Sequence, residues 1–426
     1  MRIAYLTSDF GVPVLGTKGA SVHVRRMVGA LAERGHEVRV LTPNRGSGAH
    51  ETKSLPIEEI PFSGTVAVLH EELKQEELCR GNRLSKDLRN VFYSLWLQSH
   101  AVPFLEEFGP DFLYERYTLF GTAGLELARR FDVPLVLEVN APLVEEQREQ
   151  RGLSLPRVAV AAQRLVFEQS DEVLVVSRWL EDYVRSHGAR EGHVTVIPNA
   201  ADPELFRPRR GPSEIRRKLG WEERIVLGFV GAMKPWHGVP TLVDALAELG
   251  APESAFRLLL VGDGPDLPAV RARVSALGLD SAVHYAGAVS HHEIPDWLGA
   301  ADIALVPYSA SAAPYFSPVK LFECMSMGLA VVAARLGQTE VILEHERTGW
   351  LYSAGEPGEP AATIRRVAAD LRAAARVGAA ARERILAEHT WSRNAEHVER
   401  LAERALERRR RGAGSSGTQG TRREKP

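Results

Sequence analysis

The stretch SPVKLFE, residues 317–323, places a lysine and a glutamate three residues apart behind a Ser-Pro pair. Ser317 is a residue type that caps helices and Pro318 suits a first helical turn, so the stretch predicts a helix N-terminus. Free N–H groups and the helix dipole attract phosphate there, whereas Lys320 in that turn is unfavourable unless an anion is bound. Glu323 falls on the same helical face and could accept hydrogen bonds from vicinal hydroxyls. The pair therefore fits a diphosphate and a ribose; the alternative is an ordinary ion pair on a surface face.

A second stretch with phosphate-binding character is GAMKPWHG, which lies between an apolar run and a helix-like pattern. Lys234 and His237 offer hydrogen-bond donors there, and Gly231 allows the backbone to approach a ligand closely. An ordinary βα loop without a ligand is the alternative interpretation. Further along, LLLVGDGP has strand–turn–helix order, with Gly262 just before the turn signal Asp263-Gly264, a pattern that by itself says little about function.

Two further groups of candidate residues come from the first half of the chain. The loop GVPVLGTKGASVH brings Gly16, Gly19 and His23 ahead of or into a helix-like pattern, although it matches neither G-x-G-x-x-G nor a P-loop. The stretch EVNAP places Glu138 and Asn140 at the end of an apolar run. Ligands bind beyond the carboxyl ends of strands in open α/β sheets, so both groups are candidates to line a site. For EVNAP, a loop with a helix cap is the alternative.

The composition and the missing motifs narrow the function classes. The sequence contains no H-E-x-x-H or D-x-D metal signature and no G-x-S-x-G nucleophile elbow, and we predict no metal site. The adjacent pair His291-His292 is interpreted as a solvated loop. Two distant cysteines fit a reducing compartment, and a net charge of -2 gives no overall basic field for nucleic acid.

Short apolar runs alternate with helical patterns, and this alternation starts twice. The first start is the run Arg2–Thr7 and the second is Ile225–Val230. With 426 residues, the chain suits two domains of about 150–200 residues each. The pattern predicts an α/β protein with two Rossmann-like, doubly wound parallel sheets, whose loops can face each other across a cleft. No run is long enough to span a bilayer, and MRIAYLTSDF is interpreted as a first strand and not as a signal peptide.

In order and spacing, ten stretches together resemble the retaining glycosyltransferases of family 4, over nearly the whole chain. They are KGASVHV, ALAERGHEV, VSRWLEDYV, VIPNAADPELFRP, GFVGAMKPWHGVPTLVDAL, LLLVGDGP, VHYAGAV, ADIALVPY, SPVKLFECMSMGLAVVAA and TGWLY. The resemblance implies the GT-B architecture of two Rossmann-like domains facing a central cleft. We expect an acceptor domain at 1–203 joined by a C-terminal helix at 385–408, and a nucleotide-sugar donor domain at 204–384. The Gly/Ser/Arg-rich tail 409–426 is expected to be disordered.

The resemblance also implies a reaction. A hexosyl group would move from a UDP- or GDP-sugar to an acceptor hydroxyl with retention of configuration, without a metal or another cofactor, in the biosynthesis of a glycan, glycolipid or glycoconjugate. Carried over by position, Glu323 binds the donor ribose, Lys320 and Lys234 meet the diphosphate or sugar, and Asn140 lies on the acceptor side. His23 and Glu138 join the acceptor side. The remaining donor-side residues are Gly16, Gly19, Gly231, His237, Gly262, Ser317, Pro318, Val319 and Leu321.

The sequence departs from the common family pattern at four positions. Tyr315 stands where many members have the first of two glutamates, seven residues before the second, which Glu323 matches. Ala232 and His237 replace a common arginine and lysine, and Lys234 is a candidate substitute for the arginine. Ala20 replaces the second of two paired glycines. We expect Tyr315 to mark a difference in sugar handling, since a phenol cannot supply a second carboxylate.

Two other functions remain open from the sequence. One is another nucleotide-sugar enzyme such as a 2-epimerase, and the other is a catalytically silent relative that binds a nucleotide-sugar or a partner. The expected location is the cytoplasm, and the expected acceptors are sugars, lipid-linked molecules or other small molecules. Weak contact with the inner face of a membrane is a further hypothesis, because Arg80, Arg83, Lys86 and Arg89 recur every three residues. A solvated face, with acidic residues nearby, is the favoured alternative.

Overall fold

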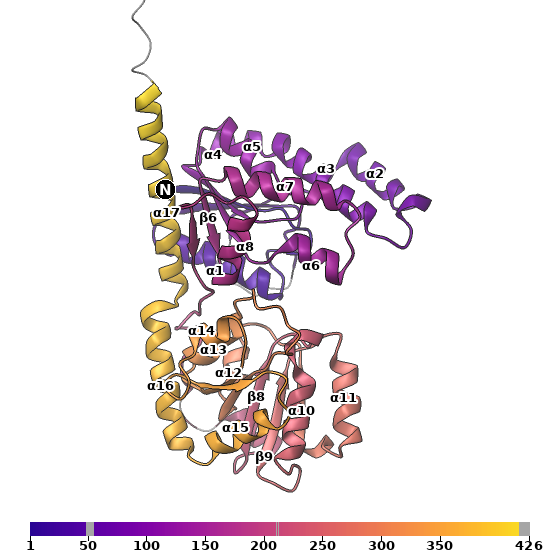
Figure 1. Ribbon diagram of the computed structural model, residues 1–426, viewed down its shortest axis with the longest axis vertical. Helices are drawn as coiled ribbons and strands as arrows, with labels where there is room; N and C mark the ends of the chain where they lie inside the picture. The colour runs from indigo at the N-terminus through magenta and orange to yellow at the C-terminus, as the bar shows by residue number, and fades with distance from the viewer. Residues whose placement is uncertain (48–54, 210, 212, 417–426) are drawn as a thin grey trace, which may run out of the picture. The chain divides into compact units, whose positions relative to one another are not determined.

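Within the described residues, seven strands of the first half of the chain pair in the order β3-β2-β1-β4-β5-β6-β7, and every pair is parallel. The computed structural model (Figure 1) describes residues 1–47, 55–209, 211 and 213–416. The strands are β1 (Arg2–Thr7), β2 (Glu37–Thr42), β3 (Ile57–Glu59), β4 (Phe112–Arg116), β5 (Leu135–Val139), β6 (Glu172–Val175) and β7 (Val194–Val196). The central strands are almost continuously apolar because helices cover both of their faces.

The second half of the chain repeats this plan with six strands. Their order is β10-β9-β8-β11-β12-β13, again with parallel pairs, which is the Rossmann order. The strands are β8 (Ile225–Val230), β9 (Phe256–Val261), β10 (Val283–Gly287), β11 (Ile303–Val306), β12 (Ala330–Arg335) and β13 (Trp350–Ser353). The two doubly wound parallel sheets confirm the fold class expected from the sequence.

Helices cover both faces of each sheet. In the first half they are α1 (Gly19–Glu33), α2 (Gly64–Leu73), η1 (Glu77–Cys79), α3 (Leu84–His100), α4 (Val102–Phe108), α5 (Ala123–Arg130), α6 (Leu143–Gln150), α7 (Pro156–Gln169) and α8 (Arg178–Ser186). In the second half they are α9 (Glu214–Leu219), η2 (Pro235–His237), α10 (Val239–Glu248), α11 (Leu267–Ala276), η3 (Asp280–Ala282), α12 (Ile294–Leu298), α13 (Val319–Ser326), α14 (Gln338–Ile342), α15 (Glu359–Ala368) and α16 (Leu371–Glu388). Figure 1 shows α3, α5 and α7 together on one face of the first sheet, and α10 beside α11 on one face of the second.

The chain divides into two units, which are described separately. Unit 1 comprises Met1–Ile197 and Ser392–Pro426, and unit 2 comprises Pro198–Trp391. The sequence placed the boundaries at 203/204 and 384/385. The observed segment 385–391 belongs to unit 2, because α16 runs to Glu388 and Thr390 then bridges to Ala201. The expected single helix 385–408 is therefore corrected to the end of α16, a break, and α17 (Trp391–Ser416).

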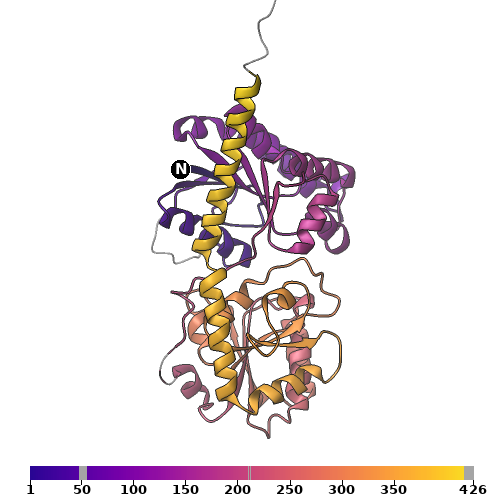
Figure 2. The ribbon, with the colours of Figure 1, turned by 60° about the vertical axis from the view of Figure 1, so that its left-hand side comes forward.

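Helix α17 runs along unit 1 (Figure 2). Its buried apolar side chains form a stripe, and arginines of the same helix make further contacts: the apolar residues are Ala395, Val398, Leu401, Ala402 and Ala405. Arg404 donates to both oxygens of the fully buried Glu172 at 2.9 and 2.7 Å, and Arg408 also contacts this carboxylate. Arg409 donates to Asp171 at 3.0 and 2.8 Å. The expectation of disorder from residue 409 differs from the structure, in which α17 continues to Ser416 and Arg409 contacts Asp171. Residues 417–426 lie outside the described part of the chain.

None of the helices in the described ranges combines the length and apolar character that a bilayer crossing needs.

Candidate active site

The start of α13 differs from the sequence expectation. The helix begins at Val319, with Pro318 in the N-cap position, and no side chain caps it. Ser317 is therefore not the cap. Its hydroxyl instead accepts a hydrogen bond of 2.9 Å from the backbone N–H of Asn199, whose side-chain amide donates to the carbonyl of Ser317 at 2.6 Å. These two bonds fix the entry to α13 and leave its first turn without a capping side chain.

Lys320, in the first turn of α13, has no partner for its ammonium group among the described residues. Nζ lies 4.5 Å from the centre of the Phe229 ring and 5.7 Å from that of Tyr308. Burial lowers the pKa of Lys320 to about 7, which the nearby Cys324 and Glu323 oppose. A buried amine with no anion beside it is costly, and a bound anion would relieve that cost. Its neighbour Leu321 is fully buried in the core, and the backbone N–H of Leu321 donates to the carbonyl of Pro318 at 2.9 Å, so neither its side chain nor its N–H is available to a ligand in this structure.

Glu323 does not pair with Lys320, so the surface ion pair considered from the sequence is absent from the described structure. Its carboxylate is buried and accepts a hydrogen bond of 2.7 Å from Nε2 of His291. His291, which the sequence placed in a solvated loop, is thus part of the site. The sequence could have indicated His291 as a site residue through its position just after β10, because Rossmann sheets bind ligands beyond the carboxyl ends of their strands.

The loop between β8 and α10 lies against Lys320. A Cβ built on Gly231 would stand 2.9 Å from Nζ of Lys320, and one on Gly262 would stand 2.1 Å from the carbonyl oxygen of Gly231. Both glycines have positive φ, so the close approach of these two loops depends on the absence of side chains. Lys234 places its ammonium 4.9 Å from the centre of the Trp236 ring.

His237 does not act as the donor that the sequence suggested. Its Nδ1 donates to the carbonyl of Ala232 in a short contact. Burial and the nearby Lys320 lower the pKa of His237 to about 3, so the ring is neutral and Nε2 carries no proton. At the position of the common family lysine, this chain therefore supplies an acceptor and no charge.

In unit 1, three of the expected acceptor-side residues lie at one place. His23 on α1 donates from Nε2 to Oε1 of Glu138 on β5 at 2.6 Å, and both side chains are buried. Burial opposes charge on Glu138, but His23 and then Arg116, 3.9 Å away, hold the pKa of this carboxyl below its usual value. Asn140 follows directly after β5 and is partly buried. Gly19 opens α1, and a Cβ added there would meet no heavy atom within 4 Å, whereas a Cβ at Gly16 would clash with Pro13.

Tyr315 lies in the segment before α13 and is partly buried, with its ring 6.3 Å from that of Phe316. Phe316 in turn stacks on Tyr308 at 4.2 Å. Tyr308 is one of the two rings near Lys320, so Tyr315 is connected to that lysine only through Phe316 and Tyr308.

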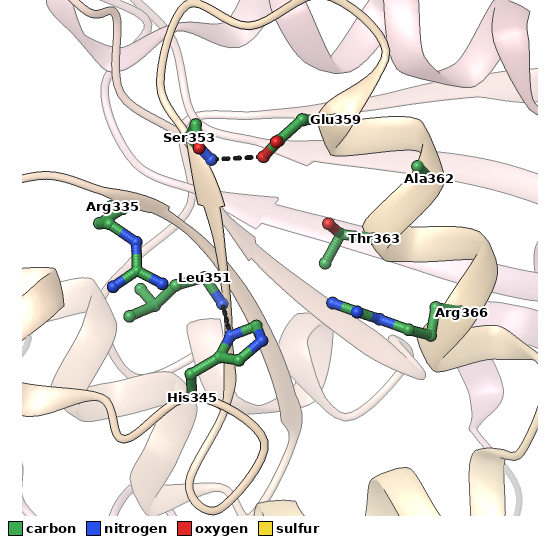
Figure 3. A pocket seen from close by; sticks show the side chains of 8 residues that line it. All are labelled: Arg335, His345, Leu351, Ser353, Glu359, Ala362, Thr363 and Arg366. Carbon is green, nitrogen blue, oxygen red and sulfur yellow. Dashed lines mark hydrogen bonds between the residues drawn. The ribbon is translucent and has the colours of Figure 1, made fainter.

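A separate pocket of about 480 Å³ lies beside β13 (Figure 3). Its two arginines are already paired, Arg335 with Glu340 at 3.3 Å and Arg366 with Glu346 at 3.5 Å. Figure 3 also shows His345 accepting from the N–H of Leu351 and Glu359 from that of Ser353. No sequence-predicted site residue lines this pocket, and each of its two arginines already pairs with a carboxylate.

In the part of the chain that the structure describes, no group of three His, Cys, Asp or Glu side chains is arranged to hold a metal ion.

Comparison with known proteins gives matches in both halves of the chain. Residues 224–370 match the family described as "Glycosyl transferases group 1", and residues 18–200 match the "Glycosyl transferase 4-like domain". The D-inositol 3-phosphate glycosyltransferase of Stackebrandtia nassauensis is 29% identical over 423 residues, covering 95% of this chain and 90% of that protein. Its counterpart in Streptomyces avermitilis is 28% identical over 64% of this chain and 60% of its own length.

The fold also matches solved structures. Anabaena HepE, crystallised in complex with UDP, superposes with a TM-score of 0.72 over 95% of this chain and all of that chain, at 22% identity. At this identity the likeness shows the fold, and it confirms the GT-B type of two Rossmann-like units.

Proposed function

Because the chain belongs to the group 1 glycosyltransferases with a 4-like N-terminal domain, it is a glycosyltransferase, and we propose that it transfers a hexosyl group from a nucleoside diphosphate sugar to an acceptor hydroxyl with retention of configuration. Unit 2 is proposed to hold the donor, and unit 1 the acceptor. Relatives named as D-inositol 3-phosphate glycosyltransferases and a structural neighbour that binds UDP support a polyol or sugar acceptor and make UDP the first nucleotide to test.

The observation that carries the proposal is the unpartnered ammonium of Lys320 at the uncapped start of α13. The N–H of Leu321 is taken by the carbonyl of Pro318, but the N–H groups that precede it in this turn and the helix dipole favour an anion. Lys320 adds an ammonium group that has no partner in the described structure. Gly231 and Gly262 keep the neighbouring loops close to the amine without side chains in the way. A diphosphate fits this combination, and Glu323 one turn along offers a carboxylate to a ribose hydroxyl.

The proposed chemistry follows from where charge develops. The bond between the anomeric carbon and the β-phosphate oxygen breaks, and a bond from the acceptor oxygen to the same face of that carbon forms. The acceptor proton passes to the departing phosphate oxygen, so atoms and charge balance. Negative charge grows on the diphosphate during this step, and Lys320 stabilises it more strongly in the transition state than in the ground state. Lys234 is proposed to assist from the neighbouring loop.

In unit 1, the hydrogen-bonded His23–Glu138 pair is proposed to fix α1 against β5 at the acceptor side. Asn140 is proposed to contact an acceptor hydroxyl. The ionised Glu138 keeps His23 in one orientation, so a variant at either position should disturb acceptor use more than nucleotide binding. Retention is tested by NMR of the anomeric proton in the product. Metal independence is tested by adding EDTA, which should leave the transfer rate unchanged.

The decisive experiment compares Glu323→Ala and Lys320→Ala with the parent in calorimetric titrations of UDP, GDP and ADP and in transfer assays with their glucose and mannose derivatives. Each variant should weaken binding of the preferred nucleotide by about 10- to 100-fold, because each removes a charged hydrogen-bonding partner. Glu340→Ala, which changes an exposed carboxylate elsewhere in unit 2, is the control. Parental turnover in both site variants would contradict the proposal, and free sugar formed without acceptor would favour the epimerase.

A catalytically silent relative is the second candidate, because His237 supplies no charge where the family commonly has lysine. Nucleotide-sugar binding without hydrolysis or transfer across an acceptor panel would support it. Tyr315→Glu restores the common family residue and should change the preferred donor sugar if Tyr315 faces it.

We propose a cytoplasmic location, with weak contact to an anionic membrane. The support is a group of exposed apolar side chains on α2 and η1, Val68, Leu69 and Leu78, close in sequence to Arg80. The basic repeat is not one helical face, because α3 begins only at Leu84. Flotation with anionic liposomes at low salt tests the contact, and a protein that stays at the bottom of the gradient contradicts it.

A further inference from the structure

His291 and Glu323 form a hydrogen-bonded pair that the two loops around them hold in place. Nε2 of His291 lies 2.7 Å from Oε1 of Glu323, and the side chains are only 13% and 7% exposed. The imidazole ring lies 5.2 Å from the ring of Phe206, which is fully buried. The pair therefore joins the segment after β10 to the first turns of α13.

The turn that carries His291 is itself fixed. Glu293 accepts hydrogen bonds on Oε2 from the backbone N–H of Ser290 at 2.9 Å and from its hydroxyl at 2.6 Å. These two bonds close the turn 290–293 around His291. The imidazole thus reaches Glu323 from a turn held by its own hydrogen bonds and from a ring packed on Phe206.

The direction of the hydrogen bond follows from the chemistry of the two groups. A carboxylate oxygen accepts, so Nε2 of His291 bears the N–H that donates this hydrogen bond to Oε1. The second oxygen, Oε2, has no hydrogen-bond partner among the described residues. One oxygen of Glu323 is therefore committed to the protein, and the other is left to accept from a ligand. The donated hydrogen bond also withdraws negative charge from a carboxylate that would otherwise face an anionic diphosphate.

We propose that His291 is a positioning residue that orients Glu323, so that Oε2 accepts a hydrogen bond from one ribose hydroxyl of the donor nucleotide. The inference rests on the proposed function, since it assigns the preference for a ribose to the same site. A carboxylate held by one hydrogen bond loses little freedom when it binds the ribose. Without His291, Glu323 could rotate or turn toward Lys320, and the distinction between ribose and deoxyribose would weaken.

The test measures this distinction directly. Among UDP, GDP and ADP, the nucleotide that binds tightest is compared with its 2′-deoxy and 3′-deoxy forms by calorimetry. In the parent, one of the two deoxy forms should bind about tenfold more weakly, the cost of one hydrogen bond to a charged acceptor. In His291→Phe, which keeps a ring against Phe206 but removes the donor, this ratio should fall to about twofold or less. His291→Gln, whose amide can still donate, should recover part of the ratio.

Two controls separate this role from a structural one. His292→Phe changes the exposed neighbour on the same turn and should leave the parental ratio intact. Glu323→Gln should lower the ratio as His291→Phe does, and the double variant should show no further loss. An unchanged ratio in His291→Phe, or tighter ribonucleotide binding in it, would overturn the inference while the proposed function stands. A parent that binds none of the three nucleotides would overturn both.

Discussion

Gly231 lies so close to Lys320 that a single added carbon would displace the amine. A Cβ on Gly231 would stand 2.9 Å from Nζ and 3.2 Å from Cε of Lys320, and the φ of Gly231 is +138°. Gly231→Ala should therefore lose about 1–2 kcal/mol of stability through backbone strain and also weaken binding of the preferred nucleoside diphosphate by about tenfold.

Gly287→Ala is the matched control for this change. Gly287 has a φ of +72° but no heavy atom within 4 Å of its would-be Cβ. It should lose similar stability in urea unfolding yet bind the nucleotide as the parent does. Equal loss of affinity in both variants would mean that backbone strain alone, and not the position of Lys320, explains the effect.

Lys320 should make nucleotide binding depend on pH. Its pKa of about 7 without ligand should rise toward the usual value for lysine, about 10.4, when a diphosphate is bound. Between these two values the complex holds more protons than the free protein, so affinity should fall as pH rises. The fall should reach up to about tenfold per pH unit above pH 7.5, where the terminal phosphate, with a pKa of about 6, is already ionised.

Calorimetry in two buffers of different ionisation enthalpy measures the proton uptake at pH 8. Lys320→Met should bind more weakly but with a flatter pH profile, whereas Lys234→Met should keep the parental slope. The same slope in Lys320→Met as in the parent would assign the proton to another group.

Glu115 on β4 should make unit 1 less stable as pH rises. Burial raises the pKa of Glu115 to about 7, and the backbone of Gly124 in the first turn of α5 offsets only part of that rise. The unfolded chain releases this proton near pH 4.5, so the folded state binds more protons between pH 4.5 and 7. The contribution of Glu115 to stability is thus complete below pH 4.5 and is lost as pH rises through 7.

Glu115→Gln should remove this dependence and gain about 2 kcal/mol of stability relative to the parent at pH 8, with no such gain at pH 4.5. The measurement is the urea midpoint of the unit 1 transition at the two pH values. Glu126→Gln, at an exposed position on α5, is the control and should change neither. A gain of equal size at both pH values would show that titration is not the cause.

Glu172 should be essential for holding α17 on unit 1. The side chain is fully buried and receives hydrogen bonds from Arg404 and a contact from Arg408. Glu172→Gln leaves two arginines without their carboxylate and should cost about 3 kcal/mol. Hydrogen exchange of the α17 amides between 392 and 411 should accelerate. Glu407→Gln removes an exposed carboxylate from the same helix and should leave exchange unchanged.

Most of the fold could be predicted because buried parallel strands appear in the sequence as short apolar runs. The runs Arg2–Thr7 and Ile225–Val230 are strands with the same bounds that the sequence indicated. Each is apolar along most of its length, since parallel strands are buried on both faces. The site could be predicted in part for a related reason. Helical spacing alone was enough to place Lys320 and Glu323 near the start of α13, and the structure leaves the lysine unpartnered. Their roles toward a ligand stay predictions.

The rest depends on partners that are far away in the sequence. Ser317 is a residue type that caps helices, but its hydroxyl accepts a hydrogen bond from the backbone N–H of Asn199 instead. From its residue type, His237 was expected to donate a hydrogen bond to a ligand. In the structure its Nδ1–H donates to the carbonyl of Ala232, and burial lowers its pKa so that the ring is neutral. The composition of the tail suggested disorder from residue 409, but Arg409 donates a hydrogen bond to Asp171, 238 residues earlier in the sequence. Spacing and residue type carry no information about such long-range pairs.

Side chains occupy backbone donors along β13, one of the two edge strands of the second sheet, and this has a consequence for the protein in concentrated solution. The outward N–H groups of Leu351 and Ser353 on β13 are taken by His345 at 3.0 Å and Glu359 at 2.7 Å. An edge strand whose donors are occupied cannot easily add a strand from another molecule, the usual route to aggregation of exposed sheets. We therefore expect His345 and Glu359 to limit aggregation through β13, a role that does not depend on catalysis.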